Sequence, residues 1–387
     1  MQLNNKRYNK IIVVHFGSIL LYPPTITLIK NLVDEEYRVL VISEQLDSLC
    51  ELYKDNEKVS FINIASHGGF SLMDRLKRRI QIGKKYKKIF ESNYENDDLV
   101  WVSGDVTTRA LGKTLKDKKY VLHIMELEQY CPLYKGAKIL KFPIKEYAKR
   151  AVAIVVPEQN RAYIQKIWWG LSKVPYVLPN KPYDLNYGNL NKNAKQIISE
   201  MKKEKRKIII YLGVIDEDRD FAEFAKAVGK MEDDFCMYMF GTANSATAEA
   251  YLQKLLNDNP FVKYCGFFPP PMHLSFLKYA YIGLLPYYVN ANREYDYQIN
   301  ALYCAPNKIF EYAGFNIPMI GTDVLGLKEP FEKYNIGICC KELTAEAVEK
   351  AIKQIDQNHD EMSKRCKEFY DDTDLKQILK RIIESVF

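Results

Sequence analysis

A short segment in the second half of the chain carries the clearest chemistry. It runs from Ala305 to Thr322 and predicts a helix, a glycine stop, a turn containing Pro318 and a buried strand. A helix that begins close to Pro306 leaves backbone N–H groups free, and these suit a phosphate. Glu311 follows about one and a half turns later and can reach the vicinal hydroxyls of a ribose. A nucleotide site is one interpretation, and an ordinary helix and strand with an exposed glutamate is the other.

Two glycines at predicted strand ends bear on the same chemistry. Gly17 and Ser18 follow the first predicted strand, where a glycine lets the backbone approach a ligand and later N–H groups can meet a phosphate. The spacing is not GxGxxG, so it favours no dinucleotide site. Gly213 ends a strand and precedes a loop that reaches Arg219, whose guanidinium can bind phosphate in a bidentate fork. A simple turn and a surface arginine at a helix start are the alternatives.

The segment around Pro306 resembles the donor-site signature of the family 4 glycosyltransferases. These are retaining enzymes with the two-domain GT-B fold that transfer a sugar from a nucleotide sugar. The resemblance rests on Pro-Asn-Lys-hydrophobic-Phe-Glu-Tyr, then a small residue, Gly and Pro, and is strongest over residues 207–345. It implies that Glu311 binds the donor ribose and that Arg219 and Lys308 grip the diphosphate.

Other features of the resemblance are weaker. The family often has an arginine directly after the strand-end glycine, where this chain has Val214. It commonly has two glutamates eight positions apart, and the first falls on Tyr303 here. Phe267 and Phe268 resemble the loop that holds the base, although core or loop packing explains them equally well. The other predicted donor-binding residues are Gly17, Ser18, Gly213, Asn300, Tyr303, Pro306 and Asn307.

A second group of residues is predicted to act on the acceptor. His123 ends a strand and Glu126 follows it, in a segment similar to the family's first-domain histidine loop. The histidine can hydrogen-bond a sugar hydroxyl, and the glutamate can orient or deprotonate an acceptor hydroxyl. A structural histidine at a strand end is the alternative. The predicted catalytic residues are His123, Glu126, Arg219 and Lys308.

Asp216, Glu217 and Asp218 have the spacing of carboxylates that share a divalent cation. Three acids just before a helix are also favourable at its positive N-terminus. We prefer the helix-start interpretation, because GT-B enzymes generally hold the diphosphate without a metal. We therefore predict no metal site and no cofactor.

Alternating strands and helices must hold these residues in place. The pattern predicts an α/β protein with two doubly wound domains and C-terminal helices. The resemblance implies that these are the Rossmann-like domains of a GT-B fold, which face a cleft. A polar break over 179–206 marks the boundary. We expect an acceptor domain over 1–180, a nucleotide-sugar domain over 181–360, and helices over 361–387 that pack back toward the first domain.

The composition limits the class of protein. The chain has 387 residues, 47% of them hydrophobic and 27% charged, which is typical of a soluble globular protein. Its eight cysteines show no zinc-site spacing, which favours reduced thiols in the cytoplasm. No apolar run approaches the length of a membrane span.

The net charge of +7 is partly local, because Lys and Arg crowd residues 75–88 within a predicted helix over 71–92. Such a helix can lie on an anionic membrane surface, and a solvated helix face is the alternative. No nucleic-acid-binding motif is present. We expect a cytoplasmic protein that is peripheral on the inner face of the membrane.

The function predicted from these features is retaining transfer of a sugar, from a UDP-sugar rather than a GDP-sugar, to a glycan or lipid-linked acceptor in surface polysaccharide or glycoconjugate synthesis. One alternative is a UDP-sugar 2-epimerase of the same architecture. Another is a non-catalytic GT-B binding protein, which Tyr303 in place of glutamate keeps open. The sequence does not determine the donor sugar, the acceptor, the linkage or the oligomeric state.

Overall fold

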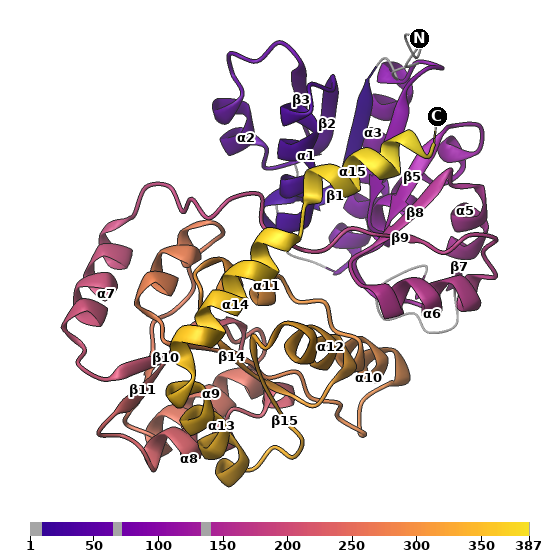
Figure 1. Cartoon of the computed structure of the whole chain (residues 1–387). Coiled ribbons are helices and arrows are strands. Elements are labelled where there is room, and N and C mark those ends of the chain that lie inside the picture. Colours follow the sequence, from indigo (N-terminus) through magenta and orange to yellow (C-terminus); the bar gives the residue numbers. More distant parts are fainter. Residues whose placement is uncertain (1–9, 65–71, 133–140, 387) are drawn as a thin grey trace, which may run out of the picture. The chain divides into compact units, whose positions relative to one another are not determined.

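The computed structural model describes residues 10–64, 72–132 and 141–386. The chain forms two compact units (Figure 1). Unit 1 comprises Met1–Pro179 and Asp374–Phe387, and unit 2 comprises Asn180–Thr373. The chain therefore leaves unit 1 once and returns to it for its last helix.

Unit 1 is built on a seven-stranded parallel sheet with the order β3-β2-β1-β4-β5-β8-β9. Its strands are β1 (Ile11–Ser18), β2 (Val39–Glu44), β3 (Val59–Asn63), β4 (Leu99–Ser103), β5 (Tyr120–His123), β8 (Ala153–Val156) and β9 (Tyr176–Val177). A separate antiparallel pair joins β6 (Cys131–Pro132) to β7 (Lys141–Phe142).

Helices cover both faces of this sheet, because its strands are apolar on both sides. Residues such as Ile11 and Val13 pack with α1 (Pro23–Asp34), α2 (Asp47–Leu52) and α15 (Leu375–Glu384). Residues such as Ile12 and Val14 pack with the other helices. Those helices are α3 (Leu72–Asn93), α4 (Asp105–Leu111), α5 (Ile144–Arg150) and α6 (Gln159–Trp169), with 3-10 turns at η1 (Ile19–Leu21) and η2 (Gly112–Leu115).

Unit 2 contains a six-stranded parallel sheet with the order β12-β11-β10-β13-β14-β15. Its strands are β10 (Lys207–Val214), β11 (Phe235–Thr242), β12 (Val262–Tyr264), β13 (Ile282–Leu285), β14 (Met319–Thr322) and β15 (Gly337–Cys340). Its helices are α7 (Lys192–Lys203), η3 (Glu217–Arg219), α8 (Ala222–Gly229), α9 (Ala246–Asp258), η4 (Met272–Tyr279), α10 (Tyr295–Leu302), α11 (Asn307–Gly314), α12 (Leu325–Tyr334), α13 (Ala345–Gln357) and α14 (His359–Asp372).

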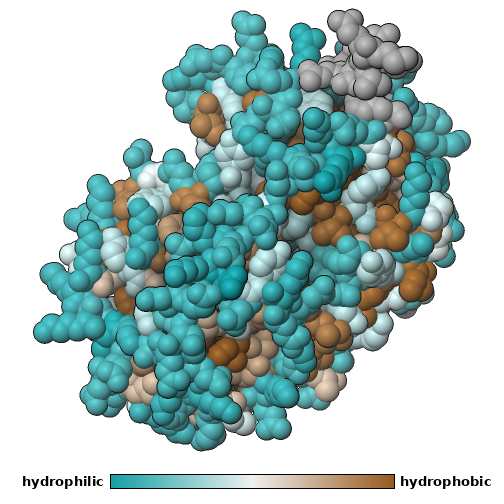
Figure 2. All heavy atoms as spheres, in the orientation of Figure 1, coloured by the Kyte–Doolittle hydropathy of each residue, from teal (hydrophilic) through white to brown (hydrophobic). Residues whose placement is uncertain are grey.

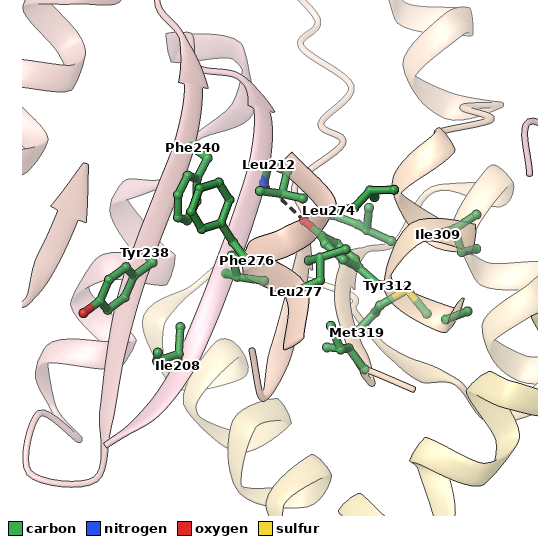
Figure 3. Packing of buried hydrophobic residues seen from close by; sticks show 14 of the residues in the cluster. Ile208, Leu212, Tyr238, Phe240, Leu274, Phe276, Leu277, Ile309, Tyr312 and Met319 are labelled. Carbon is green, nitrogen blue, oxygen red and sulfur yellow. Dashed lines mark hydrogen bonds between the residues drawn. The ribbon is translucent and has the colours of Figure 1, made fainter. Parts of the chain in front are cut away.

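One of the two cores of unit 2 fixes the elements that matter below. Figure 3 shows the Phe240 and Phe276 rings side by side and Leu274 next to Tyr312, and these residues come from β11, η4 and α11. The Tyr312 hydroxyl accepts a hydrogen bond from the Leu212 N–H at 3.2 Å, which ties α11 to β10. The helix and the 3-10 turn are therefore anchored to the same interior.

The strand order reverses at one place in each sheet. In unit 1 the reversal lies between β1 and β4, and in unit 2 it lies between β10 and β13. Loops after the carboxyl ends of such strands diverge to opposite faces and leave a crevice, which is where open α/β sheets bind ligands. Candidate residues are therefore to be sought after β1, β4, β10 and β13.

The predicted α/β class with two doubly wound domains is confirmed. The predicted polar break over 179–206 contains a helix that the sequence interpretation missed, α7, which buries Ala194, Ile197, Ile198 and Met201. The C-terminal segment expected over 361–387 divides: α14 belongs to unit 2, whereas α15 belongs to unit 1 and packs near α1.

The basic segment over 71–92 lies on α3, except that residue 71 is outside the described residues. Part of this helix packs in the protein interior, because Tyr86 and Phe90 are fully buried, whereas Ile80 is 47% exposed. The surface view in Figure 2 shows hydrophilic side chains over much of the molecule, and Lys84, Lys85 and Lys88 are exposed. None of the helices in the described part of the chain is both long and apolar enough to span a lipid bilayer.

Candidate functional site

Two predicted residues, Gly213 and Lys308, meet at the carboxyl end of β10. Gly213 has a φ of +144°, and a side chain there would lie 3.0 Å from Lys308 Nζ and 3.1 Å from Tyr211 Oη. Glycine therefore serves two needs here: it adopts a conformation that other residues avoid, and it makes room for an ammonium group. Gly213 and Lys308 are 95 positions apart in the chain, and the fold brings them into contact.

Arg219 and Lys308 form a pair of cations around one aromatic ring. The Arg219 guanidinium carbon lies 4.5 Å from the centre of the Tyr287 ring, and Lys308 Nζ lies 5.5 Å from the same centre. Burial lowers the pKa of Lys308, and the positive charge of Arg219 lowers it further. Arg219 Nε is buried and has no hydrogen-bond partner among the described residues. Two neighbouring cations with a spare donor attract an anion.

The N-terminus of α11 adds backbone donors next to these cations. Pro306 occupies the N-cap position in an extended conformation, with φ −74° and ψ 140°, and Asn307 and Lys308 open the helix. Within the described chain, no side chain caps this helix end. The first N–H groups of a helix and the positive end of its dipole both favour a negative ligand.

Glu311 lies on the same helix, one turn after Lys308, and is only 6% exposed. Its Oε1 atom is 3.3 Å from Nε2 of His273, a residue that the sequence interpretation did not select. Burial by itself would raise the pKa of Glu311, but His273 and Lys308 outweigh it and the pKa is lowered. The carboxylate is therefore charged and able to accept hydrogen bonds from hydroxyl groups.

Asp218, in η3, has a different role from the one predicted. Asp218 is buried, and its carboxylate accepts hydrogen bonds from Asn290 Nδ2 at 2.9 Å and from the Arg293 guanidinium. The next helix, α8, has Phe221 at its N-cap and no side-chain cap, so the predicted capping of a helix start is wrong for Asp218. Asp218 instead ties the loop after β10 to the loop after β13.

The remaining donor-side predictions have mixed surroundings. Phe267 is 54% exposed, whereas Phe268 is 4% exposed and its ring packs against Phe276 with the centroids 4.7 Å apart. Phe268 therefore has the packing role that the sequence left open. Asn300 lies on α10 and donates to the Asp296 carbonyl at 2.9 Å, and Tyr303 follows that helix as its C-cap.

In unit 1, the loop after β1 is occupied by internal hydrogen bonds. Gly17 has a φ of +107°, and its N–H donates to Tyr86 Oη at 3.2 Å. Its carbonyl accepts from Ser43 Oγ at 2.9 Å, and the Ser18 hydroxyl bonds to Gln45. The Gly17 N–H is thus already used, and phosphate binding by Gly17 and Ser18 stays a prediction.

The two predicted acceptor residues have opposite environments. His123 is 1% exposed, and its Nδ1 accepts from Trp101 Nε1 at 3.3 Å, so burial lowers its pKa to about 3. This environment favours the structural interpretation of His123. The Glu126 side chain is 69% exposed and lies 3.9 Å from Arg161.

Glu128 follows the same strand but was not among the predicted catalytic residues, and it has the more unusual surroundings. Burial, followed by the charge of Asp105, raises the pKa of Glu128 to about 7. Its Oε2 accepts from Cys131 Sγ at 2.7 Å. A carboxyl group that titrates near neutral pH is suited to proton transfer.

One group of side chains in the described chain has ligand atoms close enough together to share a metal ion. It consists of Asp105, Glu128 and Cys131.

Position in the fold was the signal available for the residues that the sequence interpretation missed. Tyr287 follows β13, Glu128 follows β5, and His273 follows β12 after a run of prolines. Each lies beyond the carboxyl end of a strand, where ligand-binding residues of α/β proteins gather. Predicting them required the strand order, which periodicity does not supply.

Two parallel-sheet units of this kind, joined in one chain, form a GT-B fold, and solved GT-B structures match nearly the whole chain. No model of a known protein family matches the sequence, and no curated protein is similar to it in sequence.

Three solved structures illustrate the similarity. Anabaena HepE in complex with UDP and glucose is 13% identical, with a TM-score of 0.65 and coverage of 97% of this chain and 98% of that one. Sucrose-phosphate synthase from Thermosynechococcus elongatus is 13% identical, with a TM-score of 0.67 and coverage of 96% and 97%. A candidate UDP-N-acetylglucosamine 2-epimerase from Listeria monocytogenes is 13% identical, with a TM-score of 0.62 and coverage of 97% and 95%. At these identities the comparison establishes the fold.

Proposed function

We propose that the protein is a glycosyltransferase that takes a sugar from a nucleoside-diphosphate sugar, with UDP favoured as the nucleotide. The observation that carries this proposal is the arrangement of Arg219, Lys308 and Glu311 beyond β10 and β13. Two cations suit a diphosphate, and a charged carboxylate one turn along the same helix suits a ribose. The complex of HepE with UDP and glucose supports the choice of nucleotide.

In the proposed reaction, unit 2 binds the donor and unit 1 supplies the acceptor site. Breaking the bond between the sugar and the diphosphate places negative charge on the leaving phosphate oxygen. Arg219, Lys308 and the N–H groups at the start of α11 stabilise that charge without a metal. A retaining reaction, in which the leaving phosphate helps to take the acceptor proton, is consistent with the resemblance to family 4. A glycan or lipid-linked acceptor belongs to the same proposal.

The first experiment measures binding of UDP and GDP to the purified protein by calorimetry. We expect UDP to bind, and Glu311→Ala to weaken the binding about tenfold, since a hydrogen bond to a charged group contributes about 1.5 to 3 kcal/mol. Inorganic pyrophosphate serves as the matched probe: Glu311→Ala should leave its binding unchanged, because pyrophosphate has no ribose. Equal affinity of parent and variant for both nucleotides contradicts the role of Glu311.

A second candidate function is epimerisation of a UDP-sugar at C2. Its support is the similarity to the Listeria protein, which covers nearly all of both chains. The two functions differ in the need for an acceptor. Incubation with UDP-N-acetylglucosamine alone, followed by separation of the products, discriminates them: a new UDP-sugar without release of UDP indicates an epimerase, and UDP release that depends on an added acceptor indicates a transferase.

A further inference from the structure

The contact between His273 and Glu311 involves an imidazole with one unpaired nitrogen. His273 Nε2 lies 3.3 Å from Glu311 Oε1, and the two side chains are 15% and 8% exposed. The other ring nitrogen, Nδ1, is buried and has no hydrogen-bond partner in the described chain. A buried polar atom without a partner destabilises a fold. An apolar side chain avoids that loss, so the imidazole contributes chiefly through its contact with Glu311.

The core of unit 2 holds both residues firmly. His273 is the second residue of η4, whose buried side chains are Leu274, Ser275, Phe276 and Leu277. Glu311 directly precedes Tyr312, which is fully buried and bonded to the Leu212 N–H. Figure 3 shows Leu274, Phe276 and Leu277 beside Tyr312 in one packed cluster. The chain on which each of the two residues lies is therefore held by this cluster, and the two side chains meet at 3.3 Å.

We infer that His273 is a positioning residue for nucleotide recognition: its Nε2–H donates to Glu311 and holds the carboxylate toward the ribose. This inference rests on the proposed function. Oε1 is the oxygen that His273 engages, so Oε2 is the atom we assign to a ribose hydroxyl. A carboxylate fixed before the ligand arrives loses less conformational freedom on binding, which strengthens binding.

The test uses the full chain with two substitutions of opposite character. His273→Gln keeps an N–H donor at nearly the reach of Nε2, whereas His273→Leu removes the donor and keeps the bulk. We expect His273→Leu to weaken UDP binding by about five- to twentyfold and His273→Gln to retain binding within about threefold, as expected for one hydrogen bond to a charged group. Binding of inorganic pyrophosphate should be the same in both variants and in the parent.

A double-mutant cycle separates positioning from general damage. In the Glu311→Gln background, His273→Leu should change UDP affinity by less than about twofold, because residues that act through one contact are not additive. An equal loss of UDP affinity in both backgrounds, or an equal loss in His273→Leu and His273→Gln, overturns the inference.

If His273→Leu does not fold, the UDP affinities of His273→Gln and His273→Asn are compared instead, because the shorter amide of asparagine cannot reach Glu311. In that comparison, retention by Gln and loss by Asn supports the inference, and equal affinity overturns it.

The same data distinguish this inference from the proposed function. Binding of UDP by the parent and its weakening in Glu311→Ala support the function irrespective of His273. If those two results hold and His273→Leu binds UDP like the parent, the positioning role alone is wrong. If the parent binds neither UDP nor GDP, the function and the inference are both wrong.

Discussion

The Arg219 guanidinium lies over the ring of Tyr287, with 4.5 Å between the guanidinium carbon and the ring centre. Burial raises the pKa of the Tyr287 hydroxyl to about 12, so the tyrosine is neutral and does not offset the charge of the two cations around it. The aromatic ring attracts both cations electrostatically, and Arg219 Nε has no hydrogen-bond partner among the described residues. An anion can therefore take the place that a carboxylate occupies in an ordinary salt bridge.

The first prediction concerns this pair. Arg219→Ala and Lys308→Ala should each weaken binding of UDP and of inorganic pyrophosphate by about tenfold or more, because each removes a charge-assisted hydrogen bond. Arg219→Lys should restore part of the loss, since it keeps the charge but not the fork of donors. Calorimetry with the two ligands is the measurement. Unchanged binding of pyrophosphate in Lys308→Ala shows that the ammonium does not contact the phosphates.

The second prediction concerns the tie between the two loops. Asp218→Asn weakens the bonds to Asn290 and Arg293, so we expect a loss of about 1 to 3 kcal/mol in the free energy of unfolding. Denaturant titration followed by circular dichroism measures it. Asp233, an exposed acid in the same unit, provides the control, and Asp233→Asn should change the free energy by less than about 0.5 kcal/mol. Equal stability of the two variants contradicts the tie.

The third prediction follows from the raised pKa of Glu128. Its pKa is about 7 in the folded protein, whereas an unperturbed glutamate has a pKa of 4.5, so the folded state favours the protonated carboxyl group. That contribution to stability is complete below pH 4.5 and is lost as the pH rises through 7. Glu128→Gln, which stays neutral, should therefore be more stable than the parent at about pH 8, by about 1 to 2 kcal/mol.

The difference between the Glu128 variant and the parent should shrink at about pH 5, where the parent carboxyl is itself protonated. Thermal unfolding of both proteins at the two pH values checks this. A stability difference that is the same in acid and in base shows that the pKa of Glu128 is not raised. Glu126→Gln is the matched control and should show no such pH dependence, since its side chain is 69% exposed.

The fourth prediction is that sugar transfer needs no divalent metal. Asp218 is engaged by Asn290 and Arg293, so its carboxylate is already used within the protein and is not open to a cation. We expect turnover to be unchanged in EDTA. Loss of activity that Mn²⁺ restores would reverse the prediction, and the group Asp105, Glu128 and Cys131 would then be the first to substitute.

The fifth prediction concerns attachment to membranes, which we propose is electrostatic. Tyr86 and Phe90 of α3 face the interior, and Lys84, Lys85 and Lys88 are exposed on its surface. Replacing Lys84, Lys85 and Lys88 by Gln should reduce flotation with anionic vesicles at low salt, since each basic residue near such a surface contributes about 1 kcal/mol. The exposed Lys202, Lys203 and Lys205 of unit 2 give a control with the same change of charge. If the two triple variants float equally, α3 has no special part in attachment.

The sequence by itself determined the local elements and the class of fold. The strands Leu99–Ser103 and Ile282–Leu285 begin and end where their apolar runs predict, and α11 begins after Pro306 as its proline indicates. These elements follow from short-range preferences, because apolar runs, glycine stops and proline starts act within a few residues. The helix α7 was missed although its apolar residues recur at helical spacing, because its lysines and asparagines make it resemble a linker.

Tertiary structure alone decided which side chains meet. His273 and Glu311 are 38 positions apart, and Lys308 lies 95 positions after Gly213, so no spacing within a motif predicts either contact. The contact between Gly213 and Lys308 depends on β10 lying next to β13 in the sheet. The contact between His273 and Glu311 depends on the packing of η4 and α11 in one core. Strand order is set by packing between distant segments, whereas a pattern along the chain reports only the face that each residue turns to the core. The sequence could therefore indicate a phosphate site at Pro306, but not the histidine that holds its glutamate.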